Sequence, residues 1–516
     1  MLKRSSVLAS ACVAAVMAGI AAPAFAETLQ EAIALAYRTN PTLLAQRANQ
    51  RALDESVPQA RAGLRPQIDV SASANYSRVH AGANETAPTA GIDFNGDGID
   101  DVPASPGSDG VNEATTGSAS IGLSQTLYSG GRIGHAISAA EANVLGGREN
   151  LRSIEQQVLA SVIQAYVDVL RDIEILQIRQ QNLTVLRRQL DESNARFEVG
   201  EITRTDVAQS ESRLAQSQAD LANAQAQLSV SRAAYAAVVG QAPATLVTPP
   251  QLPGVPSDFE VALSTGLAEN PSIKAAEYQL RVAESRVAAA RAEYLPSARL
   301  TASYGGSGSP DGFDLADRTA FQAGASISIP LFTGGLNQSR VAQAREQANA
   351  AQIGIEGERR GVLQDVSSSF AQVISTRASL AAGEEAVRAA TVAAEGVRQE
   401  AQVGLRTTLD VLNQELELRN AQILLTNARR NEYVAQALLL SAMGRLEGGD
   451  LDPNIELYDP VANADAVRNR GALPWDAVLE TIDRIAAPPV MPANDAEDAP
   501  IDTQLKSDVI RTAPAA

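Results

Sequence analysis

Two similar five-residue stretches show how this chain is organised. Residues 127–131 read Leu-Tyr-Ser-Gly-Gly, and residues 331–335 read Leu-Phe-Thr-Gly-Gly, an offset of 204 positions. The same offset relates Val199-Gly200 to Val403-Gly404. Self-similarity at a fixed spacing indicates an internal duplication. Most of the chain is therefore expected to consist of two copies of one architecture.

The duplication also covers the region before these stretches. Asn40-Pro41 recurs as Asn270-Pro271, here at an offset of 230. The extra residues of the first copy fall in a longer loop between positions 78 and 117. We place the first copy at 27–257 and the second at 258–446. In each copy the asparagine is expected to cap a helix whose first residue is the proline.

Apolar residues then alternate with small or polar ones in four short segments. This period of two predicts strands at about 67–78, 117–128, 297–305 and 320–331. Strands of about 9–11 residues cross a bilayer when they are tilted. One face of each strand is apolar, which suits lipid, and the other is small and polar, which suits water.

Long helices are expected after each pair of strands. Residues 148–199, 201–239 and 405–443 contain neither glycine nor proline. A helix from 132 to 199 would be about 100 Å long at 1.5 Å per residue. After position 200, apolar residues recur every seven positions, which is the spacing of helices that pack side by side as coiled coils. Each copy is therefore expected to form an antiparallel helical hairpin, with its tip at Gly200 or Gly404.

Four strands are too few to enclose an aqueous channel, and open strand edges are not tolerated in lipid. Further copies of the chain must therefore complete the sheet, and three copies would supply twelve strands. The expected fold class is an α + β membrane protein. Three copies would make a 12-stranded β-barrel with four strands per chain, continued by an α-helical coiled-coil cylinder.

The start of the chain and its charge exclude several classes of protein. Residues 1–26 have the form of a secretory signal peptide, and Cys12 within them is the chain's one cysteine. Without Lys3 and Arg4 the formal charge changes from −18 to −20, which argues against nucleic acid as a partner. There is no phosphate-binding glycine loop and no plausible Ser/His/Asp set. The protein is therefore not expected to be an enzyme or to require a cofactor.

The two-copy layout, the Asn-Pro dipeptides, the Gly-Gly stretches and the Val-Gly…Asp-Val tips resemble the TolC family of outer-membrane channels. Residues 196–207, Arg-Phe-Glu-Val-Gly-Glu-Ile-Thr-Arg-Thr-Asp-Val, are similar to the form associated with type I secretion. The resemblance covers about residues 28–446. It implies a homotrimeric exit channel, with a 12-stranded outer-membrane β-barrel in contact with outer-membrane lipid. The α-helical coiled-coil tunnel of this channel would lie in the periplasm. A periplasmic adaptor (membrane fusion protein) and an inner-membrane ABC transporter or proton-driven pump would recruit it.

The hairpin tips carry the candidate functional residues. Those expected to meet the adaptor are Val199, Gly200, Asp206, Val403, Gly404 and Asp410. Asp206 and Asp410 each follow a threonine by three positions, which predicts a capping box at each helix start. For Asp410 the resemblance adds a second role, because aspartates just after the second tip ring the closed tunnel mouth in this family. Asn413 stands where the second acidic residue would sit, so the constriction here would carry less charge.

The longer first-copy loop contains an EF-hand-like pattern. Calcium ligands would come from Asp93, Asn95, Asp97, Asp101 and the carbonyl of Ile99. Ala104 occupies the position of the bidentate glutamate, so such a site would be weak. An acidic, solvated turn explains the same residues, and both interpretations stay open.

Residues 447–516 form an acidic, proline-rich tail, which is predicted to be mostly disordered. Within it, Trp475, Val478, Leu479, Ile482 and Ile485 have helical spacing. This short helix either packs on the outside of the tunnel or docks a partner.

Two questions of function stay open at this point. The main alternative to a channel is a non-conducting periplasmic coiled-coil scaffold. Four strands of membrane length with one apolar face argue against it, because a scaffold has no need of them. Protein secretion and small-molecule efflux use similar channels, so either kind of cargo is compatible with the sequence.

Overall fold

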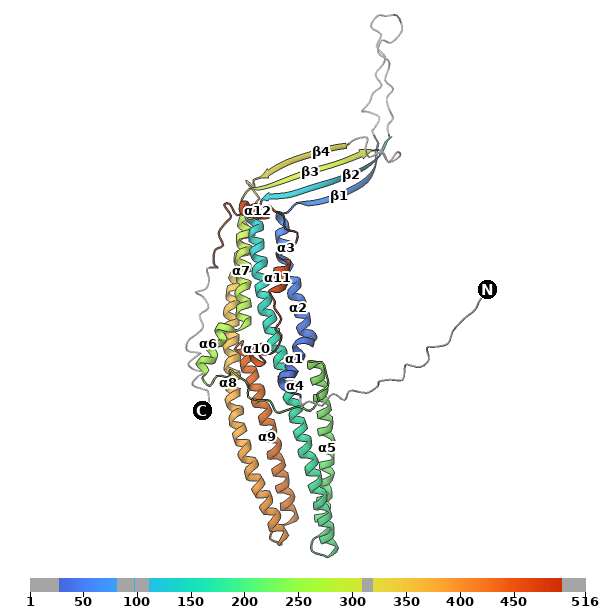
Figure 1. Cartoon of the computed structure of the whole chain (residues 1–516), viewed down its shortest axis with the longest axis vertical. Helices are drawn as coiled ribbons and strands as arrows, with labels where there is room; N and C mark the ends of the chain where they lie inside the picture. Colours follow the sequence, from blue (N-terminus) through green and yellow to red (C-terminus); the bar gives the residue numbers. More distant parts are fainter. Residues whose placement is uncertain (1–26, 81–96, 98–110, 309–318, 494–516) are drawn as a thin grey trace, which may run out of the picture.

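The chain forms a long helical body with a sheet at one end and two hairpin tips at the other (Figure 1). This computed structural model describes residues 27–80, 97, 111–308 and 319–493, so the predicted signal peptide 1–26 lies outside the described residues. Each copy of the duplication contributes two strands to the sheet and one hairpin to the body. Within the described ranges, no helix is both long enough and apolar enough to cross a membrane.

One antiparallel sheet contains four strands in the order β1-β2-β3-β4. They are β1 (Gln67–His80), β2 (Val111–Tyr128), β3 (Ser297–Gly308) and β4 (Thr319–Ser328). The strands agree with the four predicted segments, although β2 begins at 111 rather than about 117. β4 ends shortly before Pro330, which has no N–H to donate to a neighbouring strand.

The pairing of the strands repeats the duplication. Val70 lies opposite Ile121 in the first copy, and Leu300 lies opposite Ala325 in the second. These two pairs are related by the sequence offsets of 230 and 204. β2 and β3 join the two copies. β1 and β4 are left as edges, and each presents backbone groups that pair with no described strand of this chain.

The two faces of the sheet differ in polarity. One row across the apolar face consists of Val70, Ile121, Tyr304 and Phe321. Val70 and Phe321 are 76% and 70% exposed in the single chain. The opposite face carries small polar side chains, and the hydroxyls of Ser71 and Ser120 are 2.9 Å apart there. An apolar face of this extent is unfavourable in water and suits the interior of a bilayer.

Pairs of glycines start the two longest helices. Gly131 (φ +86°) precedes α4 (Arg132–Glu198), and Gly335 (φ +85°) precedes α8 (Leu336–Gln402). Glycine adopts this left-handed backbone conformation without the strain that a Cβ atom would add. Each helix has 67 residues, which corresponds to about 100 Å. Each therefore runs from the foot of the sheet to a hairpin tip.

The long helices pair into the two predicted hairpins. α4 packs along α5 (Arg204–Val239), and α8 packs along α9 (Thr408–Ala442). Residues of the seven-residue stripes are buried between them, including Val207, Leu228, Tyr235, Val411, Leu425 and Leu439. Glu432 interrupts the second stripe, where it accepts a hydrogen bond from Gln436 at 2.9 Å. This bond offsets part of the cost of removing its carboxylate from water.

Shorter helices pack against the upper part of each hairpin. The first copy supplies α1 (Leu29–Thr39), α2 (Pro41–Asp54), α3 (Ser56–Arg61) and η1 (Ala62–Leu64), and the second supplies α6 (Phe259–Glu269) and α7 (Pro271–Ala292). Asn40 caps α2 as predicted and accepts a hydrogen bond from Thr42 N at 3.0 Å. The side-chain amides of Asn40 and Asn270 also donate to backbone carbonyls at the ends of α5 and α9, both at 2.9 Å. Each asparagine thus ties a helix start to the end of its hairpin.

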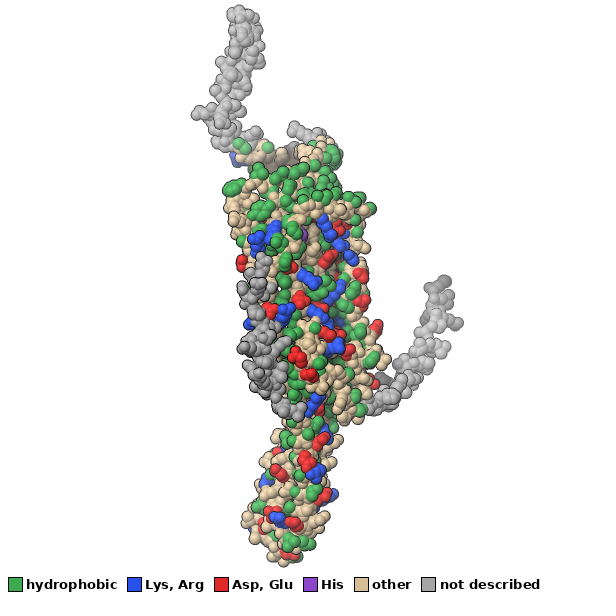
Figure 2. Space-filling model, turned by 90° about the vertical axis from the view of Figure 1, so that its left-hand side faces the viewer, with side chains coloured by type: hydrophobic (Ala, Val, Ile, Leu, Met, Phe, Trp, Pro, Cys, Tyr) green, Lys and Arg blue, Asp and Glu red, His purple; other side chains and the backbone are tan. Residues whose placement is uncertain are grey.

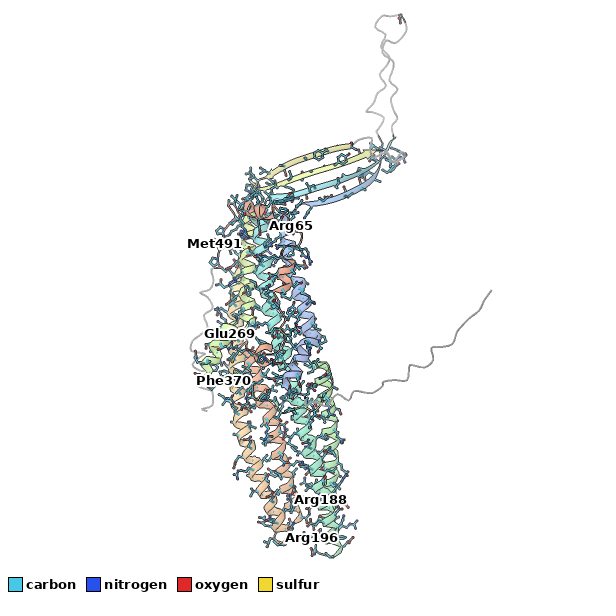
Figure 3. The ribbon with its side chains drawn as sticks, in the orientation of Figure 1. Arg65, Arg188, Arg196, Glu269, Phe370 and Met491 are labelled. Carbon is cyan, nitrogen blue, oxygen red and sulfur yellow. The ribbon has the colours of Figure 1, made fainter. Side chains whose placement is uncertain are left out.

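The C-terminal tail differs from the prediction. Residues 448–493 contain α10 (Gly448–Leu451), α11 (Ala462–Val467) and α12 (Asp476–Asp483). Arg65 donates to Asp476 at 2.8 Å, and Arg291 contacts Met491 where the tail descends beside α7 (Figure 3). The prediction of a mostly disordered tail is wrong for this part. The amino-acid composition of a segment indicates only whether the segment can bury its own side chains. This part of the tail is ordered by contacts with side chains of other helices. Residues 494–516 lie outside the described ranges.

Candidate channel mouth and docking tips

Both hairpins reverse direction at a glycine. Gly200 has φ +80° and Gly404 has φ +79°, and a Cβ added to either would contact nothing within 4 Å. The requirement for glycine therefore lies in the backbone conformation and not in packing. The neighbouring Val199 and Val403 are 72% and 71% exposed. The two tips lie at the same end of the body, as Figure 1 shows, and each presents an apolar side chain.

The predicted capping boxes are present at both helix starts. Thr203 N donates to Asp206 Oδ2 at 2.9 Å, and Thr407 N donates to Asp410 Oδ2 at 3.0 Å. In return each aspartate N–H donates to the threonine hydroxyl. Hydrogen bonds from the threonine backbone, and then from its side chain, hold the pKa of both carboxyls below the usual range. Both aspartates are therefore charged at neutral pH.

Asn413 connects the two hairpins. It lies one turn after Asp410 on α9, and its Oδ1 accepts a hydrogen bond from Arg213 of α5 at 3.2 Å. Arg213 is not among the residues predicted from the sequence. The contact joins residues 200 positions apart, and no periodicity within a single helix indicates such a pair. The structure thus adds a positive side chain at the candidate constriction.

Further positive charge lies behind this contact. Arg179 of α4 pairs with Asp220 at 2.7 Å, and Arg419 of α9 lies close to both Arg179 and Arg213. Burial, followed by the charge of Arg179, lowers the pKa of Arg419. The candidate mouth is therefore not lined by acidic groups alone.

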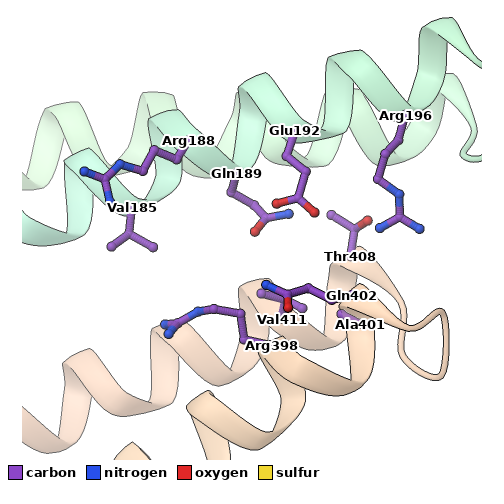
Figure 4. Close-up of a pocket in the computed structure, with 10 residues that line it drawn as sticks. All are labelled: Val185, Arg188, Gln189, Glu192, Arg196, Arg398, Ala401, Gln402, Thr408 and Val411. Carbon is purple, nitrogen blue, oxygen red and sulfur yellow. The ribbon is translucent and has the colours of Figure 1, made fainter.

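A cleft of about 310 Å³ separates the hairpins near their tips (Figure 4). Its lining comes from α4 on one side and from the end of the second hairpin on the other, namely Val185, Arg188, Gln189, Glu192, Arg196, Arg398, Ala401, Gln402, Thr408 and Val411. Farther from the tips, α9 binds α4 through Arg430 and Asp168 at 2.8 Å. The hairpins are thus joined by this ion pair farther from the tips and by the contact between Arg213 and Asn413 beside the cleft.

The candidate calcium ligands are not brought together in the described residues. Asp93, Asn95, Ile99 and Asp101 lie outside the described ranges, and Asp97 is described by itself. Elsewhere in the described part of the chain, no group of three or more His, Cys, Asp or Glu side chains is arranged to hold a metal ion.

A four-stranded sheet with one apolar face, set above two long helical hairpins, defines the chain as one unit of an outer-membrane barrel continued by a helical tunnel. The chain belongs to the outer membrane efflux protein family, whose model matches residues 32–241 and 262–445. The two matched segments correspond to the two copies of the duplication.

Individual relatives agree with this assignment. The chain is 34% identical over 447 residues to the outer membrane efflux protein BepC of Brucella suis biovar 1, covering 87% of this chain and 92% of BepC. It is 28% identical over 449 residues to the outer membrane protein TolC of Escherichia coli, covering 84% and 86%. The crystal structure of VceC from Vibrio cholerae superposes with a TM-score of 0.64 at 23% identity, covering 81% of this chain and 96% of VceC.

These comparisons confirm the predicted family, the outer-membrane location and the role as an exit channel for protein or small-molecule cargo. They disfavour the alternative of a non-conducting scaffold. The family consists of transport channels and not of enzymes.

Proposed function

We propose that three copies of this chain close into a 12-stranded barrel and a helical tunnel, which together form the exit duct of a tripartite export system. The observation that supports this most directly is the sheet, whose two edge strands, β1 and β4, pair with no described strand of the chain. Three sheets joined edge to edge leave no edge exposed to lipid. The hairpins below them would then surround one axis.

Recordings in planar lipid bilayers test this proposal. Purified trimers should give discrete conductance steps of one main size, because each trimer has one aqueous path. A coiled-coil scaffold would give no steps. The proposal would be contradicted if inserted trimers of the parent protein and of the constriction variants carried no current at any voltage.

Partners would supply the energy and the path through the inner membrane. The sequence contains no phosphate-binding glycine loop with which to use ATP. The tips present exposed apolar side chains, and Leu405 is 75% exposed beside Val403. We propose that a periplasmic adaptor binds these tips. An inner-membrane ABC transporter or proton-driven pump would then complete the system.

The identity of the cargo is part of this proposal. One relative is the alkaline protease secretion protein AprF of Pseudomonas aeruginosa, 27% identical over 320 residues and covering 60% of this chain and 66% of AprF. BepC is named as an efflux protein. The similarity of residues 196–207 to the type I secretion form favours a protein as the cargo, with small molecules as the second candidate.

The constriction is proposed to lie at Asp410 and Asn413. Asp410→Ala should raise single-channel conductance and weaken block by multivalent cations, roughly tenfold, which is the scale expected when charges within a few ångströms of an ion are lost. Asp206→Ala is the matched control, because it removes the same capping box from the first hairpin. Equal conductance changes in the two variants, or no change in either, would leave Asp410 with its capping role alone.

The block should also depend on pH in a defined direction. The pKa of Asp410 is held below its usual range by Thr407. The carboxylate therefore keeps its charge when the pH falls to about 4, where an ordinary aspartate is half protonated. Cation block should persist at that pH and disappear only at lower pH. Loss of block near pH 6 would indicate that another group is responsible.

We propose a weak calcium site at Asp93, Asn95, Asp97, Ile99 and Asp101. Its support is the spacing of oxygen ligands, and a site that lacks the bidentate glutamate would bind with Kd of about 10⁻⁴–10⁻³ M. Calorimetry on purified trimers should detect heat of calcium binding in the millimolar range. Asp93→Ala with Asp97→Ala should abolish that heat. The absence of calcium heat in the parent protein would refute the site.

A further inference from the structure

α12 lies at the foot of the sheet (Figure 1), and several of its apolar side chains are exposed to solvent. Trp475, Val478, Ile482 and Ile485 are 47%, 58%, 39% and 61% exposed. They recur at helical spacing, and the adjoining side of the helix buries Leu479 and Asp483. A solvated helix on the outside of a soluble body would normally turn polar side chains outward.

The buried side of α12 is fastened to the junction between β2 and α4. Asp483 accepts hydrogen bonds from Ser129 N at 2.5 Å, from Ser129 Oγ at 2.7 Å and from Gly134 N at 3.2 Å. Gly131 has no side chain with which to cap α4, so Asp483 supplies an acceptor that this helix start requires.

A second contact limits rotation of the helix. The Tyr128 hydroxyl donates to the carbonyl oxygen of Ile485 at 2.8 Å. A Cβ added to Gly131 would come within 2.4 Å of Ala487 Cβ, so the tail closely overlies this glycine. Because α12 is held from its buried side and from its C-terminal end, its apolar face stays directed away from the body.

α12 lies on the side of the molecule where the sheet is apolar. Tyr128, Ala298 and Ile327 share a row at the foot of the sheet, and Ile327 belongs to the apolar face. The tail descends on the left of Figure 1, which is the side that faces the viewer in Figure 2. Figure 2 shows a band of hydrophobic side chains across the sheet on that side, with arginines and lysines gathered just below it.

We propose that α12 is an interfacial anchor that seats its Trp475–Ile485 face in the periplasmic leaflet of the outer membrane, just below the barrel. This inference rests on the proposed barrel. Amphipathic helices bind bilayers by burying their apolar face while cationic side chains meet the lipid phosphates. Tryptophan is favoured at that depth. The side chains of Arg470 and Arg484, on either side of α12, are 64% and 63% exposed, and each also pairs with one carboxylate, that of Glu55 or of Glu480.

Exposed apolar residues in the second copy favour lipid over a protein as the partner of α12. At its corresponding junction Leu331 and Phe332 are 93% and 91% exposed, and a Cβ added to Gly335 would contact nothing within 4 Å. In the part of the chain that the structure describes, no segment equivalent to α12 covers this junction. A bilayer surface at the foot of the sheet would cover both the exposed face of α12 and the exposed side chains of Leu331 and Phe332.

Trp475 is the chain's one tryptophan, so its fluorescence reports directly on α12. Trimers reconstituted in vesicles of phosphatidylethanolamine and phosphatidylglycerol should lose most of this emission when the acyl chains carry bromine, because bromine quenches at contact range. Acrylamide in the water should quench it weakly. Val478→Ser with Ile482→Ser should reverse both results while trimers still form, since neither side chain is buried.

Two relocated reporters separate failure of the anchor from failure of the barrel. Trp475→Phe with Phe321→Trp moves the tryptophan onto the apolar face of the sheet, where bromine should quench it. Trp475→Phe with Leu457→Trp moves it beside α10, where bromine should have no effect. Quenching at 321 without quenching at 475 would overturn the anchor and leave the barrel intact. Quenching at neither position would overturn both.

A third outcome would show that α12 binds protein and not lipid. If Trp475 is protected from acrylamide but insensitive to bromine, a protein surface covers α12. The proposed lipid contact would then be wrong, and a second copy of the chain would be the occupant.

Discussion

A cysteine pair at Ala72 and Ile327 should link three copies of the chain into one covalent ring. Within the chain, β2 meets β3 with Leu123 opposite Ala302. The offsets of 204 and 230 carry this pair to Ile327 of one copy and Ala72 of the next. The pairings inside the two copies already obey these offsets, so the seam between copies is expected to obey them too.

The measurement is denaturing electrophoresis after oxidation or treatment with a short bifunctional thiol reagent. Opposed side chains in an antiparallel pair lie about 4.5–5.5 Å apart at Cβ, which is close enough for cross-linking. The variant should keep the mass of a trimer after boiling, whereas the parent should fall threefold in mass. The only native cysteine, Cys12, lies in the predicted signal peptide, and its removal with that peptide would leave no competing thiol.

Ser71→Cys with Ile327→Cys is the control for register. A shift of one residue turns the side chain to the other face of the sheet, so this pair should link poorly. Efficient linkage through residue 71 would show that the seam has another register. A stable folded monomer in detergent would contradict trimeric closure altogether.

Valine at both tip glycines, Gly200→Val with Gly404→Val, should abolish export while trimers still assemble. Both glycines have φ near +80°, a conformation that costs a residue with a side chain about 1–2 kcal/mol. The turns are therefore expected to change shape and to remove the docking surface at every tip of the trimer. Losing two contacts of about 2 kcal/mol each would weaken adaptor binding by on the order of 1,000-fold.

Export is measured as cargo in the medium relative to cargo in the cell, and assembly as heat-modifiable trimer in the outer-membrane fraction. Gly354→Val is the matched control, because Gly354 is exposed within α8 and a Cβ there would contact nothing within 4 Å. Normal export by the double variant would refute docking at the tips. Loss of trimers would show that the turns act in assembly instead.

The sequence by itself determined the architecture of this protein. Period-two and period-seven patterns indicate which face of a strand or helix is apolar, and these are local properties that can be read along the chain. The capping boxes at Asp206 and Asp410 and the caps at Asn40 and Asn270 follow from residues within three positions of each other. The duplication determined how these elements are arranged, because two copies with the same sequence pattern are expected to share one structure.

The tertiary structure alone decided the contacts that join distant segments. Arg213 and Asn413 are 200 positions apart, and Ser129 and Asp483 are 354 apart. Many polar residues on these helices could have formed such contacts. Which pairs do so depends on how the hairpins and the tail pack. The order of the tail was misjudged for the same reason. An acidic, proline-rich segment cannot bury a core of its own, but Asp483 is completely buried because another helix start required its carboxylate.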